Sequence, residues 1–150
     1  MTLTLKNDHV GISVRDVEAT IEWYTEKLDF VVEQRFAVNA LSFAFMAHED
    51  VKLEILGGAT TNETTAITDI VASLDPARLH HFCIAVSDLE ATLEELRSRD
   101  VNVIGEPFDV AVIGQRVAFI TDNSGNIIEI TEPGTGSQEG DRRVSMQRGA

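Results

Sequence analysis

The sequence predicts an α+β protein built from two tandem β-α-β-β-β modules. The first observation is an internal repeat with an offset of 72 residues, because residues 9–20 align with residues 81–92 without a gap. Seven of the twelve aligned positions are identical, namely His, Ile, Val, Asp, Glu, Ala and Thr. The second observation is that each copy combines short β-branched segments with one helical pattern. One supersecondary unit has therefore been duplicated.

The first module begins with a predicted strand over 9–14, which is short and rich in β-branched residues. Asp16 follows at the position of a helix N-cap, where its carboxylate can accept hydrogen bonds from free backbone N–H groups. Apolar side chains then recur at spacings of four, three and four residues and predict a helix: Val17, Ile21, Tyr24 and Leu28. Three further strands are predicted at about 30–36, 41–47 and 51–56.

The second module repeats this order. Residues 81–86 predict its first strand, Asp88 its helix N-cap, and Leu89, Leu93 and Leu96 the apolar face of its helix. Three more strands are predicted at 101–104, 115–121 and 126–131. The two modules, at about 6–57 and 78–132, are expected to form a single domain over 1–132. The linker at 58–77 is expected to contain loop, with a short helix around 66–74, and the Gly-rich segment 133–150 is predicted to be a flexible tail.

Composition narrows the possible partners and locations. The chain has 25 Asp and Glu against 12 Lys and Arg, which gives a net charge of -13 at pH 7, and the acidic excess is present in both halves. Such a surface repels phosphate backbones and anionic lipid, so we expect neither nucleic acid nor membrane as a partner. No apolar segment reaches the ~20 residues that span a bilayer. The single cysteine, Cys83, excludes an intrachain disulfide, and together with an N-terminus unlike a signal peptide it favours the cytoplasm.

Four residues of metal-ligand type occupy matched places in the repeat. His9 and His81 open the two equivalent strands, while Glu54 and Glu129 lie late in the last strand of each module. Both glutamates have apolar strand neighbours that point to the opposite face. One such histidine or glutamate alone is usually structural or solvent-exposed, but two matched pairs predict four ligands that meet on a pseudo-twofold axis. Two imidazoles and two carboxylates suit one divalent ion, namely Zn, Ni, Co, Mn or Fe.

Segments 9–16 (HVGISVRD) and 81–88 (HFCIAVSD) resemble the start of each module in the vicinal-oxygen-chelate superfamily. Segment 122–130 (DNSGNIIEI) is similar to its closing segment, and segments 79–82 (LHHF) and 114–119 (GQRVAF) resemble the epimerase branch in particular. This superfamily includes glyoxalase I, methylmalonyl-CoA epimerase, extradiol dioxygenases, and the bleomycin and fosfomycin resistance proteins. The resemblance implies the glyoxalase/bleomycin resistance/dioxygenase fold, with a cupped mixed sheet around a metal ion, and a homodimer.

The expected function is that of a metal-dependent isomerase, epimerase or lyase that acts on a small oxygenated metabolite. The metal would stabilise an enolate, and Glu129 or Glu54 would carry the proton. The alternative is a non-catalytic protein that sequesters a small molecule, and a weaker alternative is an extradiol-type dioxygenase. Ser13 stands where glyoxalase I-like enzymes carry an arginine, and residues 41–47 lack the acid that epimerase-like enzymes use as a base. We therefore expect a substrate that differs from those of glyoxalase I and methylmalonyl-CoA epimerase.

Five further side chains are expected to contact the substrate. Ser13 shares the face of the first ligand strand with His9, and Cys83 shares the corresponding face of the second. Cys83 is expected to be a small buried filler, with a reactive thiol as the alternative. Phe43 or Phe45, together with Phe119, is expected to form an apolar wall, with ordinary core packing as the alternative. Arg116 is the predicted anchor for an anionic group, with a surface ion pair as the alternative interpretation.

Overall fold

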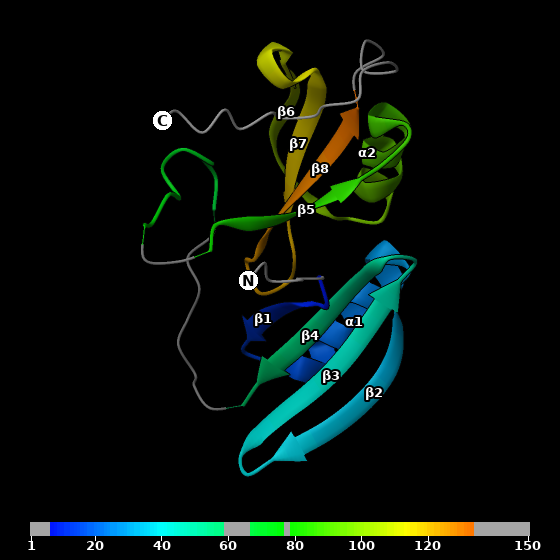
Figure 1. Ribbon diagram of the computed structural model, residues 1–150, viewed down its shortest axis with the longest axis vertical. Helices are drawn as coiled ribbons and strands as arrows, with labels where there is room; N and C mark the ends of the chain where they lie inside the picture. The colour runs from blue at the N-terminus through cyan, green and yellow to red at the C-terminus, as the bar shows by residue number, and fades with distance from the viewer. Residues whose placement is uncertain (1–6, 59–66, 77–78, 134–150) are drawn as a thin grey trace, which may run out of the picture.

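The computed structural model describes residues 7–58, 67–76 and 79–133, and in them the two modules follow one another along the chain (Figure 1). The first contains β1 (Val10–Val14), α1 (Val17–Leu28), β2 (Val31–Val38), β3 (Leu41–His48) and β4 (Val51–Gly57). The second contains β5 (His81–Ala85), α2 (Leu89–Ser98), β6 (Asn102–Val110), the 3-10 turn η1 (Ala111–Ile113), β7 (Gln115–Thr121) and β8 (Ile127–Pro133). The predicted α+β fold of two β-α-β-β-β modules is confirmed.

Each module forms one four-stranded mixed sheet. The strand orders are β1-β4-β3-β2 and β5-β8-β7-β6, so the repeat extends to the topology. The first and last strands of each module pair in parallel, and the remaining neighbours pair antiparallel. The strand that a histidine opens therefore lies beside the strand that carries a glutamate. This pairing brings the predicted ligands of each module together.

The two helices begin where the sequence predicts. The carboxylate of Asp16 accepts a hydrogen bond from the backbone N–H of Ala19 at 3.0 Å, and that of Asp88 accepts one from Ala91 at 2.9 Å. These bonds satisfy backbone donors that have no partner inside the first helical turn. In α1 the predicted Val17, Ile21 and Tyr24 are buried, Thr20 is buried beside them, and the predicted Leu28 is only partly buried. In α2 the predicted Leu89, Leu93 and Leu96 are buried. Packing of these faces against the sheets fixes the helices.

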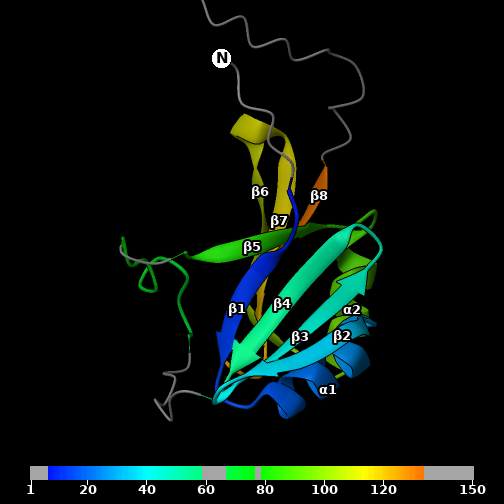
Figure 2. The same cartoon turned by 60° about the horizontal axis from the view of Figure 1, so that its bottom comes forward.

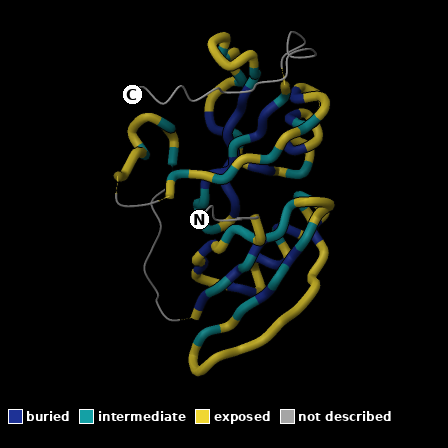
Figure 3. The backbone as a smooth tube through the Cα atoms, in the orientation of Figure 1, coloured by how far each residue is buried: buried dark blue, intermediate teal, exposed yellow. Residues whose placement is uncertain are grey.

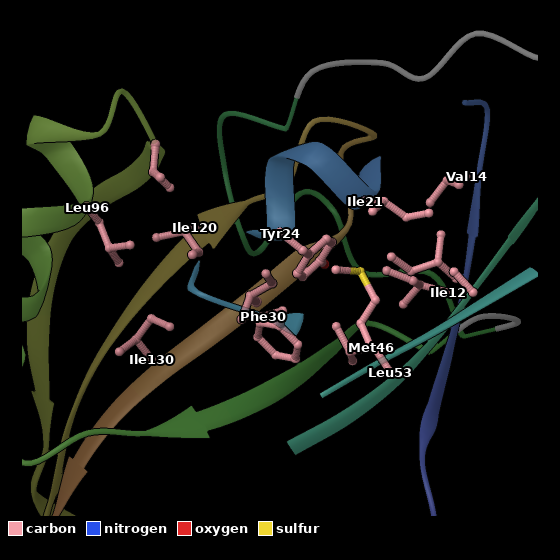
Figure 4. Close-up of a cluster of buried hydrophobic side chains, with 14 of the residues drawn as sticks. Ile12, Val14, Ile21, Tyr24, Phe30, Met46, Leu53, Leu96, Ile120 and Ile130 are labelled. Atoms are coloured by element: carbon pink, nitrogen blue, oxygen red, sulfur yellow. The ribbon is translucent and has the colours of Figure 1, made fainter. Parts of the chain in front are cut away.

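The modules share one hydrophobic core. Tyr24 and Phe30 lie between the aliphatic side chains of the first sheet and those of the second, such as Ile120 and Ile130 (Figure 4). The edge strands β1 and β5 lie where the modules meet, and α1 runs along one face of the first sheet (Figures 1 and 2). The core therefore continues from one module into the other.

Polar contacts reinforce this shared core. The hydroxyl of Tyr24 donates to Oδ2 of Asp122 at 3.0 Å, and Asn123 donates to the hydroxyl of Thr20 at 3.2 Å. The guanidinium of Arg99 donates to the backbone carbonyl of Lys27 at the end of α1 at 3.1 Å. All three bonds join residues of different modules. They fix the position of one module against the other, because a buried polar group that loses its partner carries a desolvation cost.

Two elements differ from the expectations. Strand β6 continues to Val110 instead of ending at 104, because a bulge between Ile104 and Phe108 lets it keep pairing with β7. Gly105 has a φ of 69° in this irregular stretch, a conformation that glycine tolerates well. The short helix predicted around 66–74 is absent from the described residues 67–76, which form turns around Ile70–Ser73 instead. The predicted tail at 134–150 and most of the predicted linker loop at 59–66 lie outside the described residues.

No helix in the described part of the chain combines the length and the apolar composition needed to cross a membrane.

Candidate metal centre

The first histidine–glutamate pair forms where β1 and β4 run in parallel. Gly11 lies opposite Glu54 in this pairing, and His9 precedes β1 directly. Nε2 of His9 is 3.6 Å from Oε2 of Glu54. Phe45 lies opposite Glu54 on the other side of β4, and its ring meets the His9 ring edge to face with 5.3 Å between centroids. Aromatic contact and strand pairing together hold the two donors on one face of the sheet.

The second pair repeats this arrangement between β5 and β8. Cys83 and Phe119 both lie opposite Glu129, on either side of β8. Nε2 of His81 is 2.7 Å from Oε2 of Glu129, and the His81 and Phe119 rings meet edge to face at 5.7 Å. The equivalence of the modules therefore extends from the backbone to the side chains that could bind a metal ion.

The geometry of each pair fits two neighbouring positions on one metal ion. Donors bound side by side at ~2.1 Å from a metal lie about 3 Å apart, and the observed distances of 3.6 and 2.7 Å bracket that value. In both pairs the donors are Nε2 of an imidazole and one carboxylate oxygen. The Glu54 and Glu129 side chains are 22 % and 17 % exposed, so both can reach solvent and a ligand. Each pair therefore has the chemistry and spacing of half a metal site.

The two pairs remain separate in one copy of the chain. Within residues 7–58, 67–76 and 79–133, no group of three or more His, Cys, Asp or Glu side chains is placed to hold a metal ion. Tyr24 and Arg99 fix the relative position of the modules through bonds that cross between them. The structure thus brings the four predicted ligands together as two half-sites, and a complete four-ligand centre stays a prediction.

The positions beside the two glutamates carry small side chains. A Cβ atom added to Gly11 would lie 3.6 Å from Oε2 of Glu54, an ordinary contact distance. The equivalent residue, Cys83, lies beside Glu129, and loss of water around its thiol and then the negative charge of Glu129 raise its pKa to about 11. The thiol is therefore neutral near pH 7. Since the thiolate is the reactive form, the raised pKa argues against a reactive thiol. The predicted burial of Cys83 is wrong, because the residue is exposed.

The other predicted substrate contacts fall in different places. Ser13 and Phe43 both lie opposite Leu56, two residues along β4 from Glu54, so they share the face of the first pair. Phe119 lies on the face of the second pair, as described. Arg116 is three residues before Phe119 on a regular strand, and therefore points to the opposite face, where it forms ion pairs with Glu90 of α2 and Asp109. The structure does not bring Arg116 to either half-site.

The sequence did not point to Phe36, which completes the open face of the first sheet. Phe36 stacks on Phe43 with centroids 4.8 Å apart and rings almost parallel, beside Phe45. Every residue of β2, which carries Phe36, is exposed, as the continuous exposed trace along this edge shows (Figure 3). The alternation of aromatic residues with Ala44 and Met46 in β3 could have revealed this face, because only the latter two are core residues.

Comparison with known proteins places the chain in a superfamily. The model of the Glyoxalase/Bleomycin resistance protein/Dioxygenase superfamily matches residues 6–130. The chain is 27 % identical over 128 residues to lactoylglutathione lyase GLX1 of Arabidopsis thaliana, with 84 % of this chain and 44 % of that protein covered. This chain therefore spans less than half the length of that relative. It is 22 % identical over 129 residues to the mitochondrial methylmalonyl-CoA epimerase of Homo sapiens, with 83 % and 72 % covered.

A solved structure supports the same assignment at the level of the fold. The glyoxalase family protein from Enterococcus faecalis superimposes with a TM-score of 0.72 at 19 % identity, covering 85 % of this chain and 97 % of that one. The chain belongs to the Glyoxalase/Bleomycin resistance protein/Dioxygenase superfamily. The family predicted from segments 9–16, 81–88 and 122–130 is thereby confirmed.

Proposed function

We propose that this chain is a metal-dependent enzyme that moves a proton beside a carbonyl group of a small oxygenated metabolite, as an isomerase, epimerase or lyase. The observation that carries the proposal is the matched pair of half-sites, in which His9 and Glu54 repeat the geometry of His81 and Glu129. Relatives named lactoylglutathione lyase and methylmalonyl-CoA epimerase support a reaction of this class. The proposed ion is one divalent metal, Zn, Ni, Co, Mn or Fe.

The two glutamates are the proposed bases. A metal ion held by these four residues would polarise the substrate carbonyl and so acidify the adjacent C–H bond. The Glu129 carboxylate accepts that proton and returns it to the same or the neighbouring carbon, so the substrate keeps its atom composition. Glu54 occupies the equivalent position in the other half-site. Removal by one glutamate and return by the other inverts the carbon and gives epimerisation.

A second copy of the chain is the proposed source of the missing half-site. One copy presents two pairs that are not gathered into one group among its described residues, and contacts such as Tyr24 to Asp122 oppose rearrangement of the modules. In a homodimer related by a twofold axis, the His9–Glu54 pair of one copy can face the His81–Glu129 pair of the other. Two equivalent centres then form per dimer, each with two imidazoles and two carboxylates.

Metal content tests this proposal directly. We expect elemental mass spectrometry of the purified protein to find about one equivalent of divalent metal per chain. His9→Ala and His81→Ala each remove a ligand and should lose that metal. His48→Ala is the matched control, because this exposed histidine bonds to the backbone carbonyl of Asp29 and belongs to neither pair. A wild-type protein that stays metal-free after reconstitution, or ligand variants that keep full occupancy, would contradict the proposal.

Sequestration of a small aromatic molecule is the second candidate function, and the exposed aromatic face favours it. Phe36, Phe43 and Phe45 present adjacent rings on the half-site face of the first sheet, where a planar ligand could stack. Such binding requires no metal. Equilibrium dialysis of planar aromatic compounds against protein stripped of metal by a chelator would report it. Binding that persists without metal, in a protein with no turnover, would favour sequestration.

A further inference from the structure

The His81 half-site is connected to the linker by a chain of hydrogen bonds. His80 lies directly before His81, and the Nδ1 atoms of the two rings are 2.8 Å apart. On its other side, Nε2 of His80 is 2.8 Å from the hydroxyl oxygen of Ser73. That hydroxyl donates to the backbone carbonyl of Ile70 at 2.7 Å. Four consecutive groups are thereby joined, beginning at a proposed metal ligand and ending at a carbonyl oxygen.

The position of each proton along this series of hydrogen bonds follows from its two ends, Nε2 of His81 and the backbone carbonyl of Ile70. When Nε2 of His81 binds a metal, the proton of the neutral ring must be on Nδ1, and it is donated to Nδ1 of His80. The proton of His80 is then on Nε2, which donates to the oxygen of Ser73. The Ser73 hydroxyl in turn donates to the carbonyl of Ile70, which can only accept. Every donor has an acceptor in this order, so the chain of bonds and the metal require the same tautomer.

We propose that His80 and Ser73 are positioning residues that hold His81 in the tautomer whose Nε2 is free to bind the metal. The inference rests on the proposed function, since it concerns a ligand of the proposed centre. An imidazole ligand that is oriented by a partner on its second nitrogen binds metal more tightly, because the ring is fixed in angle and tautomer. Neither His80 nor Ser73 needs to touch the metal or the substrate to have this effect.

The first module supports this interpretation with different chemistry. Asp8 lies 72 residues before His80, and its Oδ2 is 2.6 Å from Nδ1 of His9. Both proposed histidine ligands therefore have Nδ1 occupied by the side chain of the preceding residue. The partner of His9 is a carboxylate, whereas the partner of His81 is an imidazole whose orientation depends on Ser73. Asp8 and His80 differ in residue type, but each contacts Nδ1 of the histidine that follows it.

This series of hydrogen bonds gives the linker a structural role. Ile67 and Ile70 pack against the cluster of Ile104, Val117, Phe119 and Ile127, on the sheet face that carries the second half-site. This packing holds the turn that contains Ser73, and Ser73 contacts His80 directly before β5. Residues 67–76 are drawn in green at the left of Figure 1. The hydroxyl that orients His80 is therefore placed by apolar contacts of the linker.

Zinc affinity and histidine tautomers test the proposal in the full-length protein. We expect His80→Ala to weaken zinc binding by roughly 10- to 100-fold in competition with a chelating dye. His80→Asp should restore most of the affinity, because it installs the residue type that Asp8 supplies to His9. Ser73→Ala should weaken binding by a smaller factor, since His80 then keeps its place but loses its acceptor. His48→Ala should leave the zinc affinity unchanged.

Nitrogen-15 NMR of histidine-labelled, zinc-loaded protein gives a readout that general destabilisation would not reproduce. We expect a protonated Nδ1 on His81 and a protonated Nε2 with a bare Nδ1 on His80. The opposite tautomer of His80, or zinc affinity that is unchanged in both His80→Ala and Ser73→Ala, would overturn this inference and leave the metal site intact. A wild-type protein that binds no zinc or other divalent ion would overturn the proposed function, and this inference with it.

Discussion

Tyr24 is the only tyrosine of the chain, and it lies at the contact between the modules. Its side chain is fully buried, and its hydroxyl donates to Asp122. Burial, followed by the charge and hydrogen bond of Asp122, raises the Tyr24 pKa well above its usual value of 10.0. Asp122 also accepts bonds from the backbone N–H groups of Ser124 and Asn126, so this carboxylate organises the turn before β8. The hydrogen bond between Tyr24 and Asp122 therefore connects α1 to the turn before β8, the strand that carries Glu129.

We predict that Tyr24→Phe lowers the free energy of unfolding by about 1–3 kcal/mol near neutral pH, because Asp122 loses a buried donor. The raised pKa adds a pH dependence. The unfolded chain releases the phenolic proton above about pH 10 whereas the folded chain retains it, so wild-type stability falls as the pH rises beyond 10. Urea unfolding between pH 8 and 11 should show this loss relative to Tyr24→Phe, which lacks the titrating group.

The ultraviolet absorbance of tyrosinate gives an independent check on Tyr24. Because no other tyrosine is present, the absorbance rise at high pH reports Tyr24 alone. We expect this rise to coincide with alkaline unfolding instead of preceding it. A reversible rise centred near pH 10 in protein that is still folded would show that the phenol is accessible and would contradict the buried contact with Asp122.

At the scale of elements, the parallel pairs β1–β4 and β5–β8 position both half-sites. The sequence predicted the strand that follows His9 and the strands that carry Glu54, His81 and Glu129, because alternation and turn residues are local properties. The length of β6 was not predictable in this way. Its segment from Gly105 to Pro107 has the composition of a turn, but pairing with β7 extends the strand through a bulge. Tertiary pairing overrides local preference at that point.

Gly57 tests how tightly β1 and β4 are packed. A Cβ atom there would lie 2.3 Å from the backbone oxygen of Val14, which cannot move without disturbing the strand pair. We predict that Gly57→Ala lowers the free energy of unfolding by at least 1–3 kcal/mol, the usual cost of overpacking. Gly11→Ala is the matched control in the same strand pair, because its new methyl group would meet only ordinary contacts.

Thermal or urea unfolding of both glycine variants checks this prediction. Gly11→Ala should keep near wild-type stability, and any effect should appear in metal binding, since the new methyl group would lie beside Glu54. Equal stability of Gly57→Ala and the wild type would mean that the last residue of β4 is not held against β1 as the structure shows. The metal site could then not depend on that pairing for its geometry.

At the scale of the whole molecule, the arrangement of the two half-sites predicts complementation between inactive variants. One variant carries His9→Ala and Glu54→Ala, and the other carries His81→Ala and Glu129→Ala. If each centre uses one pair from each of two copies, neither homodimer can form a complete centre. A mixed dimer combines two damaged pairs at one centre and two intact pairs at the other. We therefore predict that mixing restores metal binding to one of its two centres.

The measurement is metal content of the mixed dimer after partial unfolding and reassociation, with the unmixed variants treated identically as controls. Random association of equal amounts places half of the dimers in the mixed form, so about a quarter of the wild-type metal content is expected. Recovery of no metal, in dimers shown by differential tagging to be mixed, would contradict a centre shared between copies. Light scattering that finds only monomer in the metal-loaded wild type would do the same.

The sequence by itself determined the modules, the family and the two histidine–glutamate pairs. These depend on relations that the chain carries locally or repeats, namely strand alternation, helix capping by Asp16 and Asp88, and the 72-residue offset. The repeat also places Asp8 over His80, but their residue types differ, so only the structure revealed that both contact Nδ1 of the following histidine.

Only the tertiary structure decided how the modules face one another. Contacts between residues about 70 to 100 positions apart, such as Tyr24 with Asp122 and Arg99 with Lys27, join α1 to the second module and leave the half-sites separate in one copy. Likewise, Arg116 turns toward Glu90 because strand β7 places it on the helix side of its sheet. Such outcomes depend on packing between distant segments, where many weak contacts compete and no local pattern indicates which of them will form.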